Sequence, residues 1–173
     1  MPVPCLRPAQ LATDTATSID MLLYELDKLA SEGKTFEYII LLEPTSPLRK
    51  PDDIANALTL LENTPNAESI VGVSKTEGQN PAFLTTIEAG FLRPYGRDFV
   101  NGIIPPLRRQ EIEDVYFFEG SLYISQVNAL RKKKGFYHAQ TIPWTVPRWQ
   151  SMEIDEECDF YMVEAIMKHM SGL

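Results

Sequence analysis

The sequence predicts an α/β domain in which helices flank a mostly parallel sheet. Apolar runs without polar alternation, such as Tyr38 to Leu42, are typical of strands covered on both faces. Amphipathic helical segments alternate with these runs, as parallel βαβ units require. The 173 residues, of which 44% are hydrophobic, suffice for a single domain over residues 1–173.

The chain begins with a short extended segment, residues 1–11, which we interpret as the tail of a strand. A helix follows, for which Asp14, Thr15 and Thr17 are alternative N-caps and Gly33 is the stop. Its apolar residues recur at three- and four-residue spacing: Ile19, Leu22, Leu23, Leu26 and Leu29.

A buried strand is predicted over residues 36–42, and it ends in the turn of residues 43–49. Ligands in parallel sheets bind beyond the carboxyl ends of strands, which makes this turn a candidate site. Since Pro and Ser are common turn residues, an ordinary connection is the alternative. A second helix is expected with Pro51 as its first residue and with this apolar stripe: Ile54, Ala57, Leu58 and Leu61.

A long excursion without helical periodicity covers residues 79–119. A segment of this length in a compact domain is expected either to cover a site or to pair with a second subunit. The other elements are predicted in this order: strand 69–73, strand 120–125, a short helix carrying the basic run 131–134, a Pro/Trp-rich stretch 141–149, strand 151–155 and helix 156–170.

Composition excludes several classes of function. The net charge of -8 argues against a general nucleic-acid binder, which needs a basic surface. No stretch approaches a membrane span or a signal peptide, and we expect a cytoplasmic protein. Cys5 and Cys158 have no spacing typical of a disulfide framework or a zinc site, so we expect free thiols.

Two acids near the C-terminus are candidates for metal binding. Glu153 and Asp155 lie two residues apart in a predicted strand, so their carboxylates share one face, and Mg²⁺ commonly takes one or two carboxylates. The alternative is that they start the acidic cap of the next helix. Arg109 could hold a phosphate or carboxylate through forked hydrogen bonds, or it could simply be an exposed arginine.

Four motifs together resemble one enzyme family, the N-acylneuraminate cytidylyltransferases, which include the synthetases of CMP-sialic acid and of related nonulosonic acids. The resemblance covers essentially the whole chain. In chain order the motifs are Arg7 to Ser18, Leu41 to Arg49, Gly120 to Ile124 and Glu153 to Asp155.

The resemblance implies a Rossmann-like nucleotidyltransferase sheet and the transfer of a cytidylyl group from CTP to a nonulosonic acid, for cell-surface polysaccharide or lipopolysaccharide biosynthesis. It implies that Glu153 and Asp155 are the catalytic, Mg²⁺-binding pair. It also implies that residues 79–119 are the segment through which two copies of the chain form a homodimer. The substrate-binding positions that it implies are Arg7, Glu43, Thr45, Ser46, Arg109 and Tyr123.

The chain also departs from the family pattern. Phe117 stands where sialic acid enzymes carry an arginine for the sugar carboxylate, Glu43 replaces a glutamine, and Glu153 replaces an aspartate. The family's glycine-rich, CTP-phosphate-binding loop is absent from these residues, so we expect the chain alone to be inactive. Two alternatives therefore stay open: a non-catalytic, dimerising remnant, and a related sugar nucleotidyltransferase with a non-sialic substrate.

Overall fold

The structure is a computed structural model that describes residues 8–13, 16–105 and 108–172. The chain forms two compact units. Unit 1 comprises Met1–Glu43, Lys50–Val71 and Leu122–Trp144, and unit 2 comprises Pro44–Arg49, Gly72–Ser121 and Thr145–Leu173.

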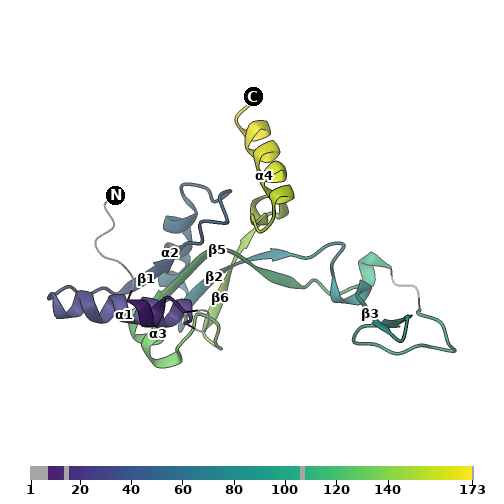
Figure 1. The fold of residues 1–173 in the computed structure, drawn as a ribbon, viewed down its shortest axis with the longest axis horizontal. Coiled ribbons are helices and arrows are strands. Elements are labelled where there is room, and N and C mark those ends of the chain that lie inside the picture. The colour runs from purple at the N-terminus through teal and green to yellow at the C-terminus, as the bar shows by residue number, and fades with distance from the viewer. Residues whose placement is uncertain (1–7, 14–15, 106–107, 173) are drawn as a thin grey trace. The chain divides into compact units, whose positions relative to one another are not determined.

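Helices and strands are interspersed along the chain, which confirms the α/β expectation (Figure 1). The helices are α1 (Ser18–Ser31), α2 (Asp53–Asn63), α3 (Val127–Lys133) and α4 (Glu157–Met170). The strands are β1 (Tyr38–Leu41), β2 (Ser69–Lys75), β3 (Thr85–Glu88), β4 (Phe91–Pro94), β5 (Tyr116–Gln126) and β6 (Thr141–Val146).

The main sheet has the strand order β1-β5-β2-β6 and contains parallel strands. β1 and β5 pair antiparallel, with Tyr38 opposite Gln126 and Leu41 opposite Tyr123. β2 and β6 run in the same direction: the Glu68 N–H donates to the Gln140 carbonyl at their starts, and Ser74 Oγ donates to the Val146 carbonyl near their ends. β5 is thus the reversed strand of a mixed sheet.

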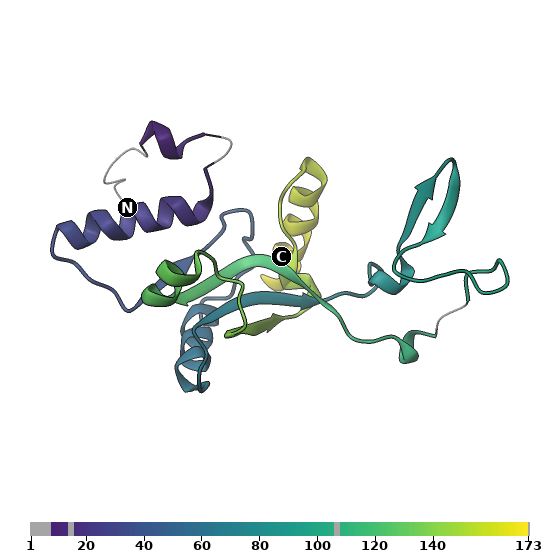
Figure 2. The ribbon, with the colours of Figure 1, turned by 90° about the horizontal axis from the view of Figure 1, so that it is seen from below.

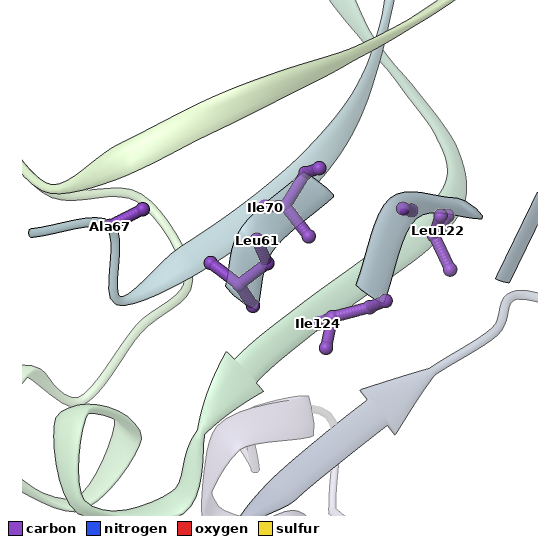
Figure 3. Close-up of a cluster of buried hydrophobic side chains, with 6 residues drawn as sticks. Leu61, Ala67, Ile70, Leu122 and Ile124 are labelled. Carbon is purple, nitrogen blue, oxygen red and sulfur yellow. The ribbon is translucent and has the colours of Figure 1, made fainter. Parts of the chain in front are cut away.

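Unit 1 is built around an apolar core. The Thr17 side chain and Asp20 form a capping box that starts α1, which selects Thr17 among the predicted N-caps. Figure 3 shows the core side chains that α2, β2 and β5 supply. The buried cluster comprises Ala57, Leu61, Ala67, Ile70, Leu122 and Ile124.

Unit 2 contains the predicted excursion and the last helix. β3 and β4 form an antiparallel hairpin within the excursion, carried on extended segments that leave β2 and enter β5 (Figure 2). A capping box of Glu156 and Asp159 starts α4.

Several predicted boundaries were wrong. Residues 151–155 are not a strand, and β6 occupies 141–146 within the Pro/Trp-rich stretch instead. β5 begins at Tyr116, earlier than the predicted strand 120–125, and α2 begins at Asp53 because Pro51 and Asp52 form a turn. The predicted N-terminal strand lies mostly outside the described residues, and Ala9–Leu11 form a 3-10 turn.

The expectation of full burial holds for β2 but not for β1. Ser69 to Ser74 of β2 are all buried, whereas β1 has no buried residue and Ile40 is 38% exposed. β1 is the terminal strand of the described sheet, which explains its partial exposure. In the described part of the chain, no helix has the length and apolar character needed to cross a membrane.

Candidate active site

The turn after β1 and the segment before α4 meet in unit 2. The Ile154 N–H donates to the Thr45 carbonyl at 2.8 Å, and Ser46 Oγ donates to Glu153 Oε1 at 3.1 Å. Ser46 is only 2% exposed, so its hydroxyl is fixed by packing. The structure therefore brings the adjacent Thr45 and Ser46 together with Glu153, which lies more than 100 positions later in the sequence.

Arg49 ties the turn to the centre of the unit. Its Nε donates to the Ser121 carbonyl at 2.8 Å, and the neighbouring Leu48 is buried. The arginine that closes the sequence motif therefore anchors the turn to β5.

A second carboxyl group, that of Glu119, lies in the same interior and was missed by the sequence analysis. Its side chain is fully buried, and Ser121 Oγ donates to its Oε1 at 2.5 Å. Its Oε2 is buried and has no hydrogen-bond partner among the described residues. Burial raises the pKa of Glu119, and the nearby Glu153 carboxylate raises it further, against the lowering effects of Ser121 and Arg49.

Two glycines make room for the two carboxyl groups. A Cβ atom on Gly72 would overlap the Glu119 carboxyl group, and one on Gly120 would overlap that of Glu153. Gly120 also has a φ of +76°, a conformation that residues with side chains rarely adopt. Glycines inside strands often mark a close approach of this kind, so Gly72 was an indirect sequence signal for Glu119, and Gly120 was one for Glu153.

Glu153 and Asp155 line a cavity of about 340 Å³ in unit 2. Glu153 is partly buried and Asp155 is exposed. Basic, acidic and aromatic side chains share this cavity. Its other lining residues include Lys75, Glu77, Phe117, Arg148 and Asp159.

The cap of α4 is made by other acids than this pair. Asp159 Oδ2 accepts the backbone N–H of Glu156 at 2.9 Å and that of Asp155 at 3.0 Å. These bonds lower the pKa of Asp159. The capping role considered for Glu153 and Asp155 therefore belongs to Glu156 and Asp159.

The donor set of the cavity fits Mg²⁺. No cluster of three potential metal ligands occurs within the described ranges. Mg²⁺ nevertheless needs only one or two carboxylates, because water and substrate phosphates complete its shell. Glu153 and Asp155 would hold the ion, and the hydrogen bond from Ser46 would orient Glu153.

The other predicted site residues are not among those that line this cavity. Glu43 and Tyr123 belong to unit 1, where the Tyr123 ring packs against Phe136 with centroids 5.4 Å apart. Arg7 lies outside the described residues. Arg109 is in the 3-10 turn Arg109–Glu111, but its side chain is not described. The roles of these four residues stay predictions.

No family model matches the chain, but comparison with individual known proteins gives relatives. The chain is 30% identical over 173 residues to the CMP-N,N'-diacetyllegionaminic acid synthase of Legionella pneumophila, covering 96% of this chain and 69% of that protein. It is 29% identical over 158 residues to the N-acylneuraminate cytidylyltransferase of Streptococcus agalactiae, covering 91% of this chain and only 36% of that protein.

A solved structure shows the same fold. CMP:2-keto-3-deoxy-manno-octonic acid synthetase complexed with CTP superposes with a TM-score of 0.58 at 13% identity, over 91% of this chain and 70% of that one.

Proposed function

Since the chain belongs to the family of the N-acylneuraminate cytidylyltransferases and CMP-N,N'-diacetyllegionaminic acid synthases, we propose that it transfers a cytidylyl group from CTP to a nonulosonic acid. The observation that carries this proposal is the fixed Glu153 carboxylate, held by Ser46 beside Asp155 at one cavity. In the proposed reaction a sugar hydroxyl oxygen bonds to the α-phosphorus of CTP, and the bond from that phosphorus to pyrophosphate breaks.

Glu153 and Asp155 are the proposed ligands of Mg²⁺, which when bound offsets negative charge on the reacting phosphates. Ser46 fixes the direction of one ligand, and the backbone bond between Ile154 and Thr45 fixes the segment that carries both. With these hydrogen bonds, the carboxylates of Glu153 and Asp155 can each present an oxygen to the cavity without rearranging at the moment of reaction.

Four further residues are proposed to contact substrate: Arg7, Glu43, Arg109 and Tyr123. Their support is the match to the family's motifs. The same match supports a cytoplasmic enzyme that supplies an activated sugar for cell-surface polysaccharide, including lipopolysaccharide.

The test is pyrophosphate release from CTP in the presence of Mg²⁺ and a panel of nonulosonic acids. Asp155→Ala is expected to lower kcat by about 100-fold or more, since a charge-stabilising group is lost. Asp98→Ala removes an exposed acid outside the cavity and serves as the matched control. Unchanged turnover in Asp155→Ala would rule out the metal role, and turnover confined to other sugars would favour the non-sialic alternative.

We further propose that the 173 residues alone release no measurable pyrophosphate, because they contain no glycine-rich phosphate loop. The assay therefore compares this chain with any longer product of the same reading frame. Robust turnover by the short chain would overturn this part of the proposal. Loss of turnover in both lengths would favour the non-catalytic alternative.

The excursion supports a homodimer as the working form. Its hairpin and adjoining loop expose large apolar side chains that a second copy of the chain could cover: Ile87, Phe91, Leu92, Tyr95, Val100 and Ile103. Ile87 is 75% exposed, and Ile87→Asp is expected to shift the molecular mass measured by light scattering from dimer to monomer. Thr86→Asp, at the adjacent exposed strand position, is the control. A wild-type monomer would contradict the dimer.

A further inference from the structure

The candidate cavity presents an electrostatic problem for an acidic substrate. Four carboxylates and two cations line it, which gives an excess of two negative charges. The cations are Lys75 and Arg148, and the acids are Glu77, Glu153, Asp155 and Asp159. Glu153 and Asp155 are the proposed ligands of Mg²⁺, whose charge would be shared with the phosphates of CTP. A carboxylate entering beside the remaining acids is favoured by a cation of its own, because like charges in a partly enclosed site repel.

The two cations are not equivalent. Lys75 Nζ lies 2.6 Å from Asp114 Oδ1, and the hydrogen bond to Asp114 raises the pKa of Lys75. Its charge is already matched. Among the described residues, by contrast, no carboxylate lies within ion-pair distance of the exposed Arg148 guanidinium.

Arg148 stands on an anchored turn. It begins the 3-10 helix Arg148–Ser151, where its carbonyl accepts Ser151 Oγ at 2.9 Å and the Pro147 carbonyl accepts the Gln150 N–H at 2.9 Å. Gln150 and Ser151 are buried, so the backbone under Arg148 is fixed. The cavity also has an apolar wall, since Phe117 lines it and is 39% exposed.

We propose that Arg148 binds the carboxylate of the sugar acid and thereby selects acidic over neutral substrates. This inference rests on the proposed function, and it draws on the acids that the relatives' names contain. A guanidinium offers paired N–H donors that match the two oxygens of a carboxylate, whereas an ammonium acts as a point charge. Arg148 is thus a specificity-determining residue, distinct from the acids proposed to hold the metal.

The test measures binding and turnover of N,N'-diacetyllegionaminic acid and N-acetylneuraminic acid, each beside its methyl ester, with the full reading frame of the protein. Arg148→Gln is expected to weaken binding of the acids by about 10- to 100-fold, the range of a charge-assisted hydrogen bond. Binding of the neutral esters is expected to stay unchanged. The affinity of Arg148→Lys for the acids should lie between those of wild type and Arg148→Gln. Arg131→Gln, which removes an exposed arginine paired with Asp27 in unit 1, should leave the affinity for acids and esters unchanged.

Three results would overturn the inference alone while the enzyme still turns over a sugar acid. The first is an equal loss of affinity for acid and ester in Arg148→Gln, and the second is no loss for either. The third is a raised KM for CTP with an unchanged KM for the sugar, which would place Arg148 on phosphate. If the wild-type protein neither binds nor turns over any nonulosonic acid, the proposed function falls together with this inference.

Discussion

β2 and β5 each contribute to two interiors of opposite character. In unit 1 they supply Ile70, Leu122 and Ile124 to a wholly apolar cluster. In unit 2, β5 supplies Glu119 and Ser121 to a buried polar group, and Gly72 of β2 lies beside it. Strand continuity therefore allows one sheet to carry a stabilising core and a chemical site at different positions along its length.

The two interiors differ in what their burial contributes. Each fully buried Leu or Ile contributes roughly 1.5–3 kcal/mol by leaving water. A buried carboxyl group contributes nothing of this kind, and its ionised form is penalised unless partners are supplied. The unit 1 core should thus contribute most of the free energy of unfolding. The contribution of the unit 2 interior should depend mainly on how tightly its side chains fit and on whether its carboxyl groups are protonated.

The largest expected effect is on the apolar core. Leu122→Ala should lower the free energy of unfolding by about 2–5 kcal/mol, because it removes a fully buried side chain and leaves a cavity. Urea denaturation followed by circular dichroism measures the loss. Leu60→Ala, at a position 41% exposed on α2, is the matched control and should cost much less. Equal costs would contradict the assignment of the core.

A tight fit in the polar interior should give the next largest effect. Gly72→Ala should destabilise by about 1–3 kcal/mol, because its Cβ meets the Glu119 carboxyl group. Gly78→Ala, where no atom lies within 4 Å of the added Cβ, should cost little. The cost of Gly72→Ala should shrink in a Glu119→Ala background, and strictly additive costs in this double-mutant cycle would disprove the contact.

Protonation of Glu119 should make stability depend on pH. The folded pKa of Glu119 is raised above the ordinary value of 4.5. Between the unfolded and the folded pKa, the folded state therefore keeps a proton that the unfolded state has lost. The free energy of unfolding falls as pH rises through this range. Glu119→Gln should match wild type at pH 4 and exceed its Tm at pH 8. A difference of about 1 kcal/mol corresponds to about 2–4 °C.

Thermal melts from pH 4 to 8 with a chelator measure this effect. Glu113→Gln, which makes the same replacement at an exposed acid, is the control. A Tm difference between Glu119→Gln and wild type that does not change with pH would show that burial does not shift the carboxyl group.

The smallest expected effect lies at the start of α1. Thr17→Ala removes the side chain that accepts the Asp20 N–H at 3.1 Å, and should cost about 1 kcal/mol in urea denaturation. Thr59→Ala, at an exposed position inside α2, should be neutral or slightly stabilising because alanine favours helix. If both variants behave alike, the cap does not contribute to stability.

The sequence predicted the parts of the fold that depend on local pattern. The spacing of apolar residues in α1 and the unbroken apolar run in β2 were sufficient to predict these two elements, because each pattern reflects the burial of the element that carries it. β6 was missed because Pro143 interrupts a short run that is only partly buried, and residues 151–155 were assigned to a strand from alternation alone.

The site was predictable only as far as its motifs extend. Ser46 and Glu153 were both candidates, but their hydrogen bond depends on two segments meeting in three dimensions. Glu119 gave no sequence signal of its own, because burial of an acid is decided by its neighbours. Arg148 was likewise unremarked, since a lone arginine in a Pro/Trp-rich stretch has no periodicity to distinguish it.

The position of β1 at the end of the strand order has a consequence for amide hydrogen exchange. β1 pairs with β5 on one side, and the described sheet has no strand on the other. Alternate N–H groups along Tyr38–Leu41 therefore point either to β5 or away from it. In deuterated solvent those facing away should exchange quickly and their neighbours slowly, and any segment that docks along this edge should slow the fast set selectively.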